Sequence, residues 1–129
     1  LVLAALEATL IDYEAVTLPP TVQLIQSTVA NFRPRTNALA ERLAAAGLVV
    51  SVSPADGWAG AGSAPGRALA SVVVRVSVDQ PNSVLRRLRC GQPAVVARID
   101  NDDLVIDLRT VAPADDEAVF CAVLAATRG

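Results

Sequence analysis

Apolar residues recur every three or four positions along the first 47 residues, which is the spacing of one face of an α-helix. The first such stripe contains Leu3, Leu6, Leu10 and Tyr13. It predicts a helix that ends before Pro19 and Pro20. A second stripe runs from Thr21, a capping residue, to Gly47, which can end a helix in the left-handed conformation. Pro34 interrupts this stripe, and because an interior proline costs about 3 kcal/mol, we expect a kink or two helices there.

Valine-rich runs replace the helical spacing in the middle of the chain and indicate β-strands. We predict strands over residues 48–53 and 70–78, joined by a glycine-rich stretch, and a short helix over residues 83–89. Near the end of the chain, Pro113 and the acidic residues after it are typical of a first helical turn. A final helix is therefore predicted over residues 115–127.

Residues 95–109 carry the clearest hairpin signal, because two alternating runs flank Asn101-Asp102, residue types that tolerate the left-handed backbone of a tight turn. If Asp100 pairs with Asp103, every side chain on one face of the hairpin is apolar. That face contains Val95, Ala97, Ile99, Leu104, Ile106 and Leu108. The opposite face contains Val96, Arg98, Val105, Asp107 and Arg109. A shift of one residue would mix the two sets, so the sequence predicts this register.

The predicted order of elements is helix, helix, strand, strand, helix, strand, strand, helix. An antiparallel sheet with helices on one face makes an α+β two-layer sandwich. At 129 residues the chain is long enough for one domain with a core. We therefore expect a single domain, in which residues 1–47 are a helical lead-in and residues 48–129 form the α+β sandwich.

Met, His and Lys are absent from the sequence. The missing Met at the start leads us to expect a piece of a longer polypeptide. Without His or Lys the chain lacks the usual general base, the usual metal ligand and an amine side chain that forms imines. We therefore expect neither catalysis by the chain alone nor a metal site. The net charge of −2 favours no particular partner.

The two cysteines and the apolar start of the chain bear on its compartment. Cys90 and Cys121 match no zinc or redox spacing, so we expect reduced thiols that pack in the core of an intracellular protein. Residues 1–10 are apolar but contain Glu7 and lack a basic flank, which fits neither a signal peptide nor a transmembrane segment. We expect a cytoplasmic protein with no membrane contact.

Two groups of residues are candidates for a binding site. The glycine-rich residues 58–71 miss the dinucleotide fingerprint by one residue and lack the lysine of a P-loop, so composition alone favours a surface loop. In the predicted hairpin, Asp107 can lie diagonal to Arg98 on the face that also contains Arg109. Such a group is more often structural than ligand-binding.

A third group, on the predicted short helix, is basic. It consists of Arg86, Arg87 and Arg89. These arginines could touch RNA phosphates, but three arginines without interleaved aromatic residues are more often a solvated face.

Three stretches, in this order, carry a family resemblance: "LVLAALEATLIDY", "AGAGSAPGRALAS" and "GQPAVVARIDNDDLVIDLRTVAPADDEAV". The second is similar to the "GGGS-x-PG-x-x-L-P-S" loop of bacterial selenocysteine synthases, the L-seryl-tRNA(Sec) selenium transferase family. The third resembles the closing hairpin and helix of that family, and the first resembles the stretch after its catalytic core. Together the three stretches extend over nearly the whole chain.

The resemblance implies the carboxy-terminal small domain of a fold-type-I pyridoxal phosphate (PLP) enzyme. The lysine that carries PLP would lie upstream, in a large domain, so no catalytic residue is expected in this chain and the chain alone should be inactive. The implied reaction converts seryl-tRNA(Sec) to selenocysteinyl-tRNA(Sec) with selenophosphate as the selenium donor. The implied assembly is a homo-oligomer.

The resemblance also implies substrate-binding residues. The loop residues are Gly62, Ser63, Pro65 and Gly66, which would face the active-site cleft with little side chain. The hairpin residues are Arg98, Asp107 and Arg109, of which the two arginines would contact the substrate or the acceptor-end phosphate. Two alternatives stay open: the small domain of a related PLP-dependent lyase, and a non-catalytic module for binding or assembly.

Overall fold

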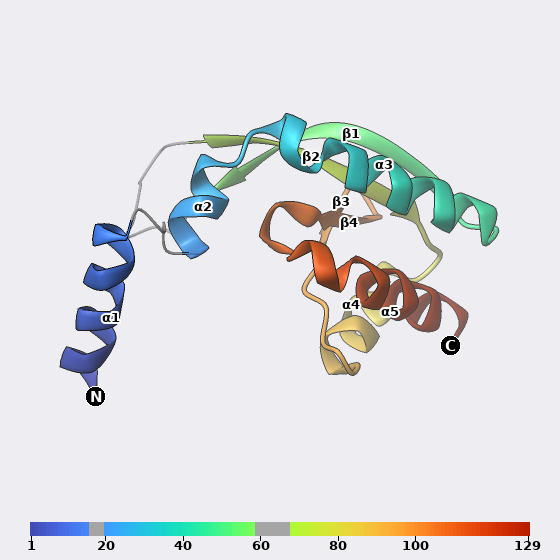
Figure 1. Cartoon of the computed structure of the whole chain (residues 1–129). Helices are drawn as coiled ribbons and strands as arrows, with labels where there is room; N and C mark the ends of the chain where they lie inside the picture. Colours follow the sequence, from blue (N-terminus) through green and yellow to red (C-terminus); the bar gives the residue numbers. More distant parts are fainter. Residues whose placement is uncertain (16–19, 59–67) are drawn as a thin grey trace.

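A computed structural model describes residues 1–15, 20–58 and 68–129 of the chain. Five α-helices and four β-strands make up most of this part (Figure 1). The helices are α1 (Val2–Glu14), α2 (Pro20–Gln26), α3 (Val29–Ala45), α4 (Pro81–Cys90) and α5 (Asp116–Arg128). The strands are β1 (Val49–Trp58), β2 (Ala68–Ser77), β3 (Arg98–Asp100) and β4 (Asp103–Asp107). Two short 3-10 helices, η1 (Leu108–Thr110) and η2 (Pro113–Asp115), join β4 to α5.

The four strands form one antiparallel sheet in the order β1-β2-β4-β3. The strands β1 and β2 pair along their whole length, from Val49 with Ser77 to Trp58 with Ala68. Helix α4 connects β2 to β3, and β4 returns to pair with β2. The strands that the sequence predicts are therefore confirmed, and β1 extends five residues beyond its predicted end.

The hairpin of β3 and β4 has the predicted register. Asp100 pairs with Asp103, and both turn residues between them have positive φ, 51° at Asn101 and 64° at Asp102. The strand nevertheless ends at Asp107, two residues earlier than the predicted end of the hairpin. The reason is local: the Asp107 carboxylate accepts a hydrogen bond of 2.9 Å from the main-chain N–H of Arg109, which folds residues 108–110 into η1.

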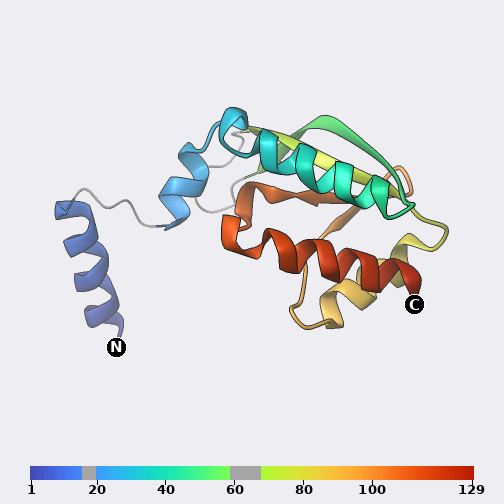
Figure 2. The same ribbon diagram turned by 45° about the vertical axis from the view of Figure 1, so that its right-hand side comes forward.

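Three helices cover one face of the sheet and confirm the α+β two-layer sandwich (Figure 2). Helix α5 packs against α3 on one side and α4 on the other. Apolar residues from all three helices and from β2 and β4 share one core. Its members include Leu39, Leu43, Val74, Val76, Val84, Leu88, Leu104, Ile106, Val119 and Val123. Helix α3 thus belongs to the helix layer, although it lies within the predicted lead-in of residues 1–47.

The helical region before the sheet contains two helices after α1, as one of the two expectations had it, but the break is not at Pro34. It lies at Ser27 and Thr28, and Pro34 sits inside α3. Thr28 starts α3 because its main-chain N–H donates to the Asn31 side-chain oxygen at 2.7 Å. Because α3 begins at Val29, Pro34 lies in its second turn, and only the first turn precedes the proline and can be disrupted by it.

Gly47 ends α3 as the sequence predicts. Its φ is +93°, which glycine adopts without the steric cost that other residues have. The Gly47 N–H donates to the Ala44 carbonyl at 2.9 Å, and the Leu48 N–H donates to the Leu43 carbonyl at 3.1 Å. These two bonds make a Schellman motif, which turns the chain from α3 into β1.

The cysteines and α1 differ from the packing that their sequence indicates. Both Cys90 and Cys121 are free thiols, but they are exposed rather than in the core, because they occupy the solvent sides of α4 and α5. Helix α1 forms at its predicted place, yet none of its residues is buried. In the part of the chain that the structure describes, no helix is long and apolar enough to cross a membrane.

Candidate functional site

The candidate site lies where β1, β2 and η1 meet the end of α2. The predicted loop residues Gly62, Ser63, Pro65 and Gly66 are outside the described residues. The two strand ends that flank residues 59–67 are described, and they pair with each other through Trp58 and Ala68. The three hairpin residues of the predicted site, Arg98, Asp107 and Arg109, are all described.

Arg109 is a buried arginine that joins three elements. Its guanidinium donates to two carbonyls at the end of α2, those of Leu24 at 3.1 Å and Ser27 at 2.9 Å. It also donates to the carbonyl of Ala70 in β2. The carbonyl end of a helix carries partial negative charge, so α2 offsets part of the cost of burying this cation. Arg109 therefore fixes α2 to the sheet.

Two features of Arg109 set it apart from an ordinary ion pair. Within residues 1–15, 20–58 and 68–129, no carboxylate forms a salt bridge with its guanidinium. Its Nε is buried and has no hydrogen-bond partner among the residues that the structure describes. The guanidinium instead lies over the ring of Phe32, 4.9 Å from the ring centre, a distance at which a cation is attracted to an aromatic face.

Asp107 orients the strands around Arg109 instead of forming an ion pair with Arg98. The Ser71 hydroxyl donates to the Asp107 carboxylate at 2.8 Å, and the same carboxylate accepts the N–H of Arg109. The hairpin register does make Asp107 a diagonal neighbour of Arg98, as predicted. In the described part of the chain, however, no salt bridge joins the two side chains, and Arg98 is exposed on the edge strand β3.

A cavity of about 420 Å³ lies beside Arg109, between α2, α3 and η1. Its lining includes Gln23, Leu24, Ser27, Phe32, Arg35 and Arg109. Arg35 is neutralised by Asp116: two nitrogens of its guanidinium donate to the carboxylate, at 2.8 and 2.5 Å. The hydrogen bonds to Asp116 raise the pKa of Arg35 above its ordinary value. Of the two arginines in this lining, Arg109 is therefore the one without a carboxylate partner in the described part of the chain.

The chain offers few groups for a metal or cofactor. Among the residues described, no three His, Cys, Asp or Glu side chains gather where they could hold a metal ion. The whole sequence contains no lysine, so none of its side chains could bind PLP covalently as an imine. The arginine-centred cluster can bind carbonyl and anionic oxygens and can orient a neighbouring segment.

Two polar contacts near the site were not anticipated from the sequence. Arg75 of β2 donates to the Asp100 carboxylate at 2.5 Å and to the Ser53 hydroxyl at 3.0 Å, on the sheet face without helices. A signal was present, because Ser71 and Arg75 are polar residues four apart in a valine-rich strand and so share one face. The Arg35–Asp116 pair had no such local signal, since 81 positions separate its members.

The fold places the chain among α+β two-layer sandwich domains with an antiparallel sheet. Comparison with known protein families is more specific. The family model for L-seryl-tRNA selenium transferase matches residues 1–112. The chain belongs to this family.

Individual relatives agree with the family match. The chain is 37% identical to the L-seryl-tRNA(Sec) selenium transferase of Hyphomonas neptunium over 120 residues, which cover 88% of the chain and 26% of the relative. It is 32% identical to that of Moorella thermoacetica over 136 residues, covering 98% and 29%. It is 31% identical to that of Clostridium botulinum over 117 residues, covering 84% and 25%. The chain thus spans about a quarter of the length of these curated relatives.

Proposed function

We propose that the chain is the carboxy-terminal small domain of a selenium transferase that converts seryl-tRNA(Sec) to selenocysteinyl-tRNA(Sec), with selenophosphate as donor. The observation that carries the proposal is the family match over residues 1–112, together with the similarity to relatives that are L-seryl-tRNA(Sec) selenium transferases. The resemblance of the glycine-rich loop and the closing hairpin supports the same function. The fold adds that the two strands on either side of the loop and the strands of the hairpin belong to one sheet.

The proposal divides the chemistry between this chain and a large domain. PLP, when bound, supplies the electron sink that lets the serine hydroxyl leave and selenium take its place. Because the chain has no lysine, the residue that holds PLP belongs to the large domain, and the chain alone is inactive. A single domain, in which α3 of the helical lead-in completes the helix layer of the sandwich, is part of the same proposal. So are cytoplasmic location and assembly into a homo-oligomer.

Within this chain, we assign the substrate-facing role to the glycine-rich loop and the neighbouring hairpin. The loop residues are Gly62, Ser63, Pro65 and Gly66, where small side chains let the main chain approach the substrate. Arg98 is exposed and takes the acceptor-end phosphate. Asp107 and Arg109 do not touch the substrate themselves. Their hydrogen bonds to Ser71 and Ala70 hold the start of β2, the strand that follows the loop.

The test uses the whole enzyme that contains this chain. It should form selenocysteinyl-tRNA(Sec) from seryl-tRNA(Sec) and selenophosphate, and Gly62→Val should lower turnover without unfolding the protein. Ala64→Val adds similar bulk in the same loop, outside the assigned residues, and should have a smaller effect. Equal turnover of Gly62→Val and the unmodified enzyme would remove the loop assignment. Turnover of free amino acids without any dependence on tRNA would replace the proposed function by that of a related PLP-dependent lyase.

A further inference from the structure

Helix α4 carries a concentration of positive charge that the rest of the chain lacks. Residues 80–99 contain four arginines and neither aspartate nor glutamate, whereas the whole chain has a net charge of −2. Three of these arginines, Arg86, Arg87 and Arg89, are on α4. A run of positive charge in a chain with a negative net charge indicates that the positive charge is concentrated on one part of the surface.

The packing of α4 leaves two of these arginines free to face a partner. Val84 and Leu88 are buried in the core and fix the rotation of the helix. Arg86 and Arg89 are exposed, and because they are three positions apart they are neighbours on the helix surface. In the described part of the chain the salt bridges involve Arg35, Arg42 and Arg75, and none involves an arginine of α4.

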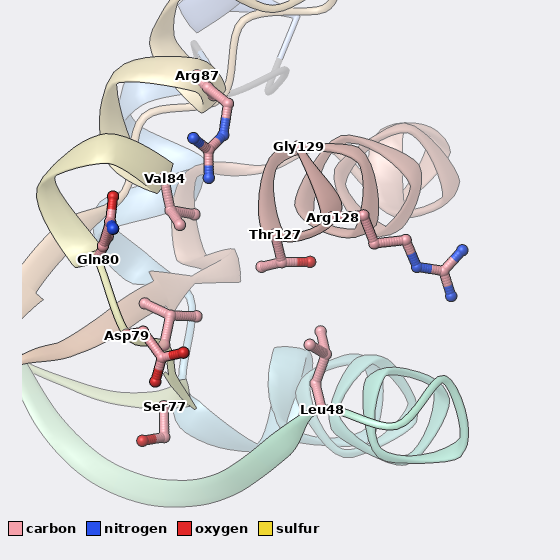
Figure 3. Close-up of a pocket in the computed structure, with 10 residues that line it drawn as sticks. Leu48, Ser77, Asp79, Gln80, Val84, Arg87, Thr127, Arg128 and Gly129 are labelled. Carbon is pink, nitrogen blue, oxygen red and sulfur yellow. The ribbon is translucent and has the colours of Figure 1, made fainter.

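Arg87 is held in a different way. Its Nε donates to the carbonyl of Ala126 in α5 at 2.7 Å, which fixes the side chain at the rim of a cavity of about 440 Å³ (Figure 3). Asp79 and Arg128 also line this cavity, and Figure 3 shows the Arg128 side chain pointing away from α4. Asp79 therefore lines the same cavity as Arg87, whereas Arg86 and Arg89 are outside its lining and, within the described residues, form no salt bridge.

The two exposed arginines of α4 indicate which kind of partner this surface binds. The planar guanidinium of arginine matches phosphate oxygens in pairs. Two exposed arginines on one helix surface can therefore bind successive phosphates of an extended anion. The sequence has one Trp, one Tyr and two Phe, and none of them is on α4, so bases have no stacking platform there. The partner that fits is an RNA backbone, read by its phosphates and not by its sequence.

We propose that Arg86 and Arg89 of α4 bind phosphates of the tRNA substrate. The proposal rests on the proposed function, which supplies the RNA, but it assigns the contact to arginines other than Arg98 and Arg109. Because each neutralised phosphate releases a counterion, the contact should appear in the salt dependence of tRNA binding.

The experiment measures the affinity of the whole enzyme for seryl-tRNA(Sec) at several salt concentrations. With Arg86→Gln and Arg89→Gln together, the slope of log K against log salt should become shallower by about 1.8, from about 0.9 for each phosphate. Binding at 0.1 M salt should weaken by up to about 60-fold, which is the same slope taken from 1 M to 0.1 M. The Michaelis constant for tRNA should rise while kcat at saturating tRNA stays unchanged.

Arg33→Gln with Arg128→Gln is the matched control, because both arginines are exposed, neither forms a salt bridge within the described residues, and the charge change is the same. An unchanged slope in the α4 variant, or an equal change in the control, would overturn the α4 assignment and leave the proposed function standing. An unmodified enzyme that neither binds nor uses seryl-tRNA(Sec) would instead overturn the proposed function. The two failures are therefore distinguishable.

Discussion

Replacing Arg109 by alanine tests whether this residue holds the fold together. The change removes three hydrogen bonds from a charged donor, to the carbonyls of Leu24, Ser27 and Ala70. Such bonds contribute about 1.5–3 kcal/mol each. Two of the freed carbonyls belong to residues that line the cavity beside Arg109, where water can replace part of what they lose. We expect the free energy of unfolding to fall by about 3 kcal/mol, against about 5–15 kcal/mol for a typical domain.

Urea unfolding followed by circular dichroism measures this loss as a lower midpoint at an unchanged slope. Arg109→Lys should recover less than half of the loss, because one ammonium group cannot reach both α2 and β2 as the planar guanidinium does. Arg98→Ala is the control: this arginine is exposed, so we expect a change within about 0.5 kcal/mol. A loss below about 1 kcal/mol for Arg109→Ala would refute the structural role. So would weaker seryl-tRNA binding by a fully folded Arg109→Lys enzyme, which would indicate a direct substrate contact.

Three further predictions concern the helices. The hydrogen bond from Arg42 lowers the pKa of Glu117. The stabilisation that this pair contributes is therefore present above the ordinary glutamate pKa and is lost as pH falls through the lowered value. Wild type and Glu117→Gln should converge in stability in acid, and a difference that persists there would contradict the role of the pair. Gly47→Ala should lower the free energy of unfolding by about 1 kcal/mol, because its φ of +93° strains any residue with a Cβ, although no atom of the described residues lies within 4 Å of an added Cβ. An unchanged midpoint in thermal or urea unfolding would contradict the cap. Cys90 and Cys121 should both react with a thiol reagent in the native chain, and protection of either would contradict their exposure.

Local patterns predict most of the fold. The alternation around Asn101-Asp102 determines the hairpin register, because only the pairing of Asp100 with Asp103 keeps polar side chains off the core face. Gly47 is recognisable as a helix end because its position requires positive φ. The sequence predicts a break at Pro34, because an interior proline is a strong helix-breaking signal. The break between α2 and α3 lies earlier because Thr28 forms a cap with Asn31, which is a weaker signal in the sequence.

The candidate site is less accessible from sequence, because it depends on contacts between distant residues. The position of Arg109 on the hairpin could be predicted, but its partners Leu24 and Ser27 are more than 80 residues away in the sequence. Both contribute main-chain carbonyls, which every residue has, so the residue types give no signal for these contacts. Asp107 was predicted beside Arg98, and the register agrees, yet its carboxylate bonds Ser71 instead. Register determines which side chains are neighbours but not which of them form hydrogen bonds.

The central claim is that this chain is a working part of a selenium transferase. The most direct measurement is the transfer of selenium from labelled selenophosphate to seryl-tRNA(Sec), by the enzyme that contains the chain and by the same enzyme with these 129 residues deleted. We predict labelled selenocysteinyl-tRNA(Sec) from the first and none above background from the second, with the second protein still soluble and able to bind PLP. Equal labelling by both proteins, or none by the complete enzyme, would contradict the claim.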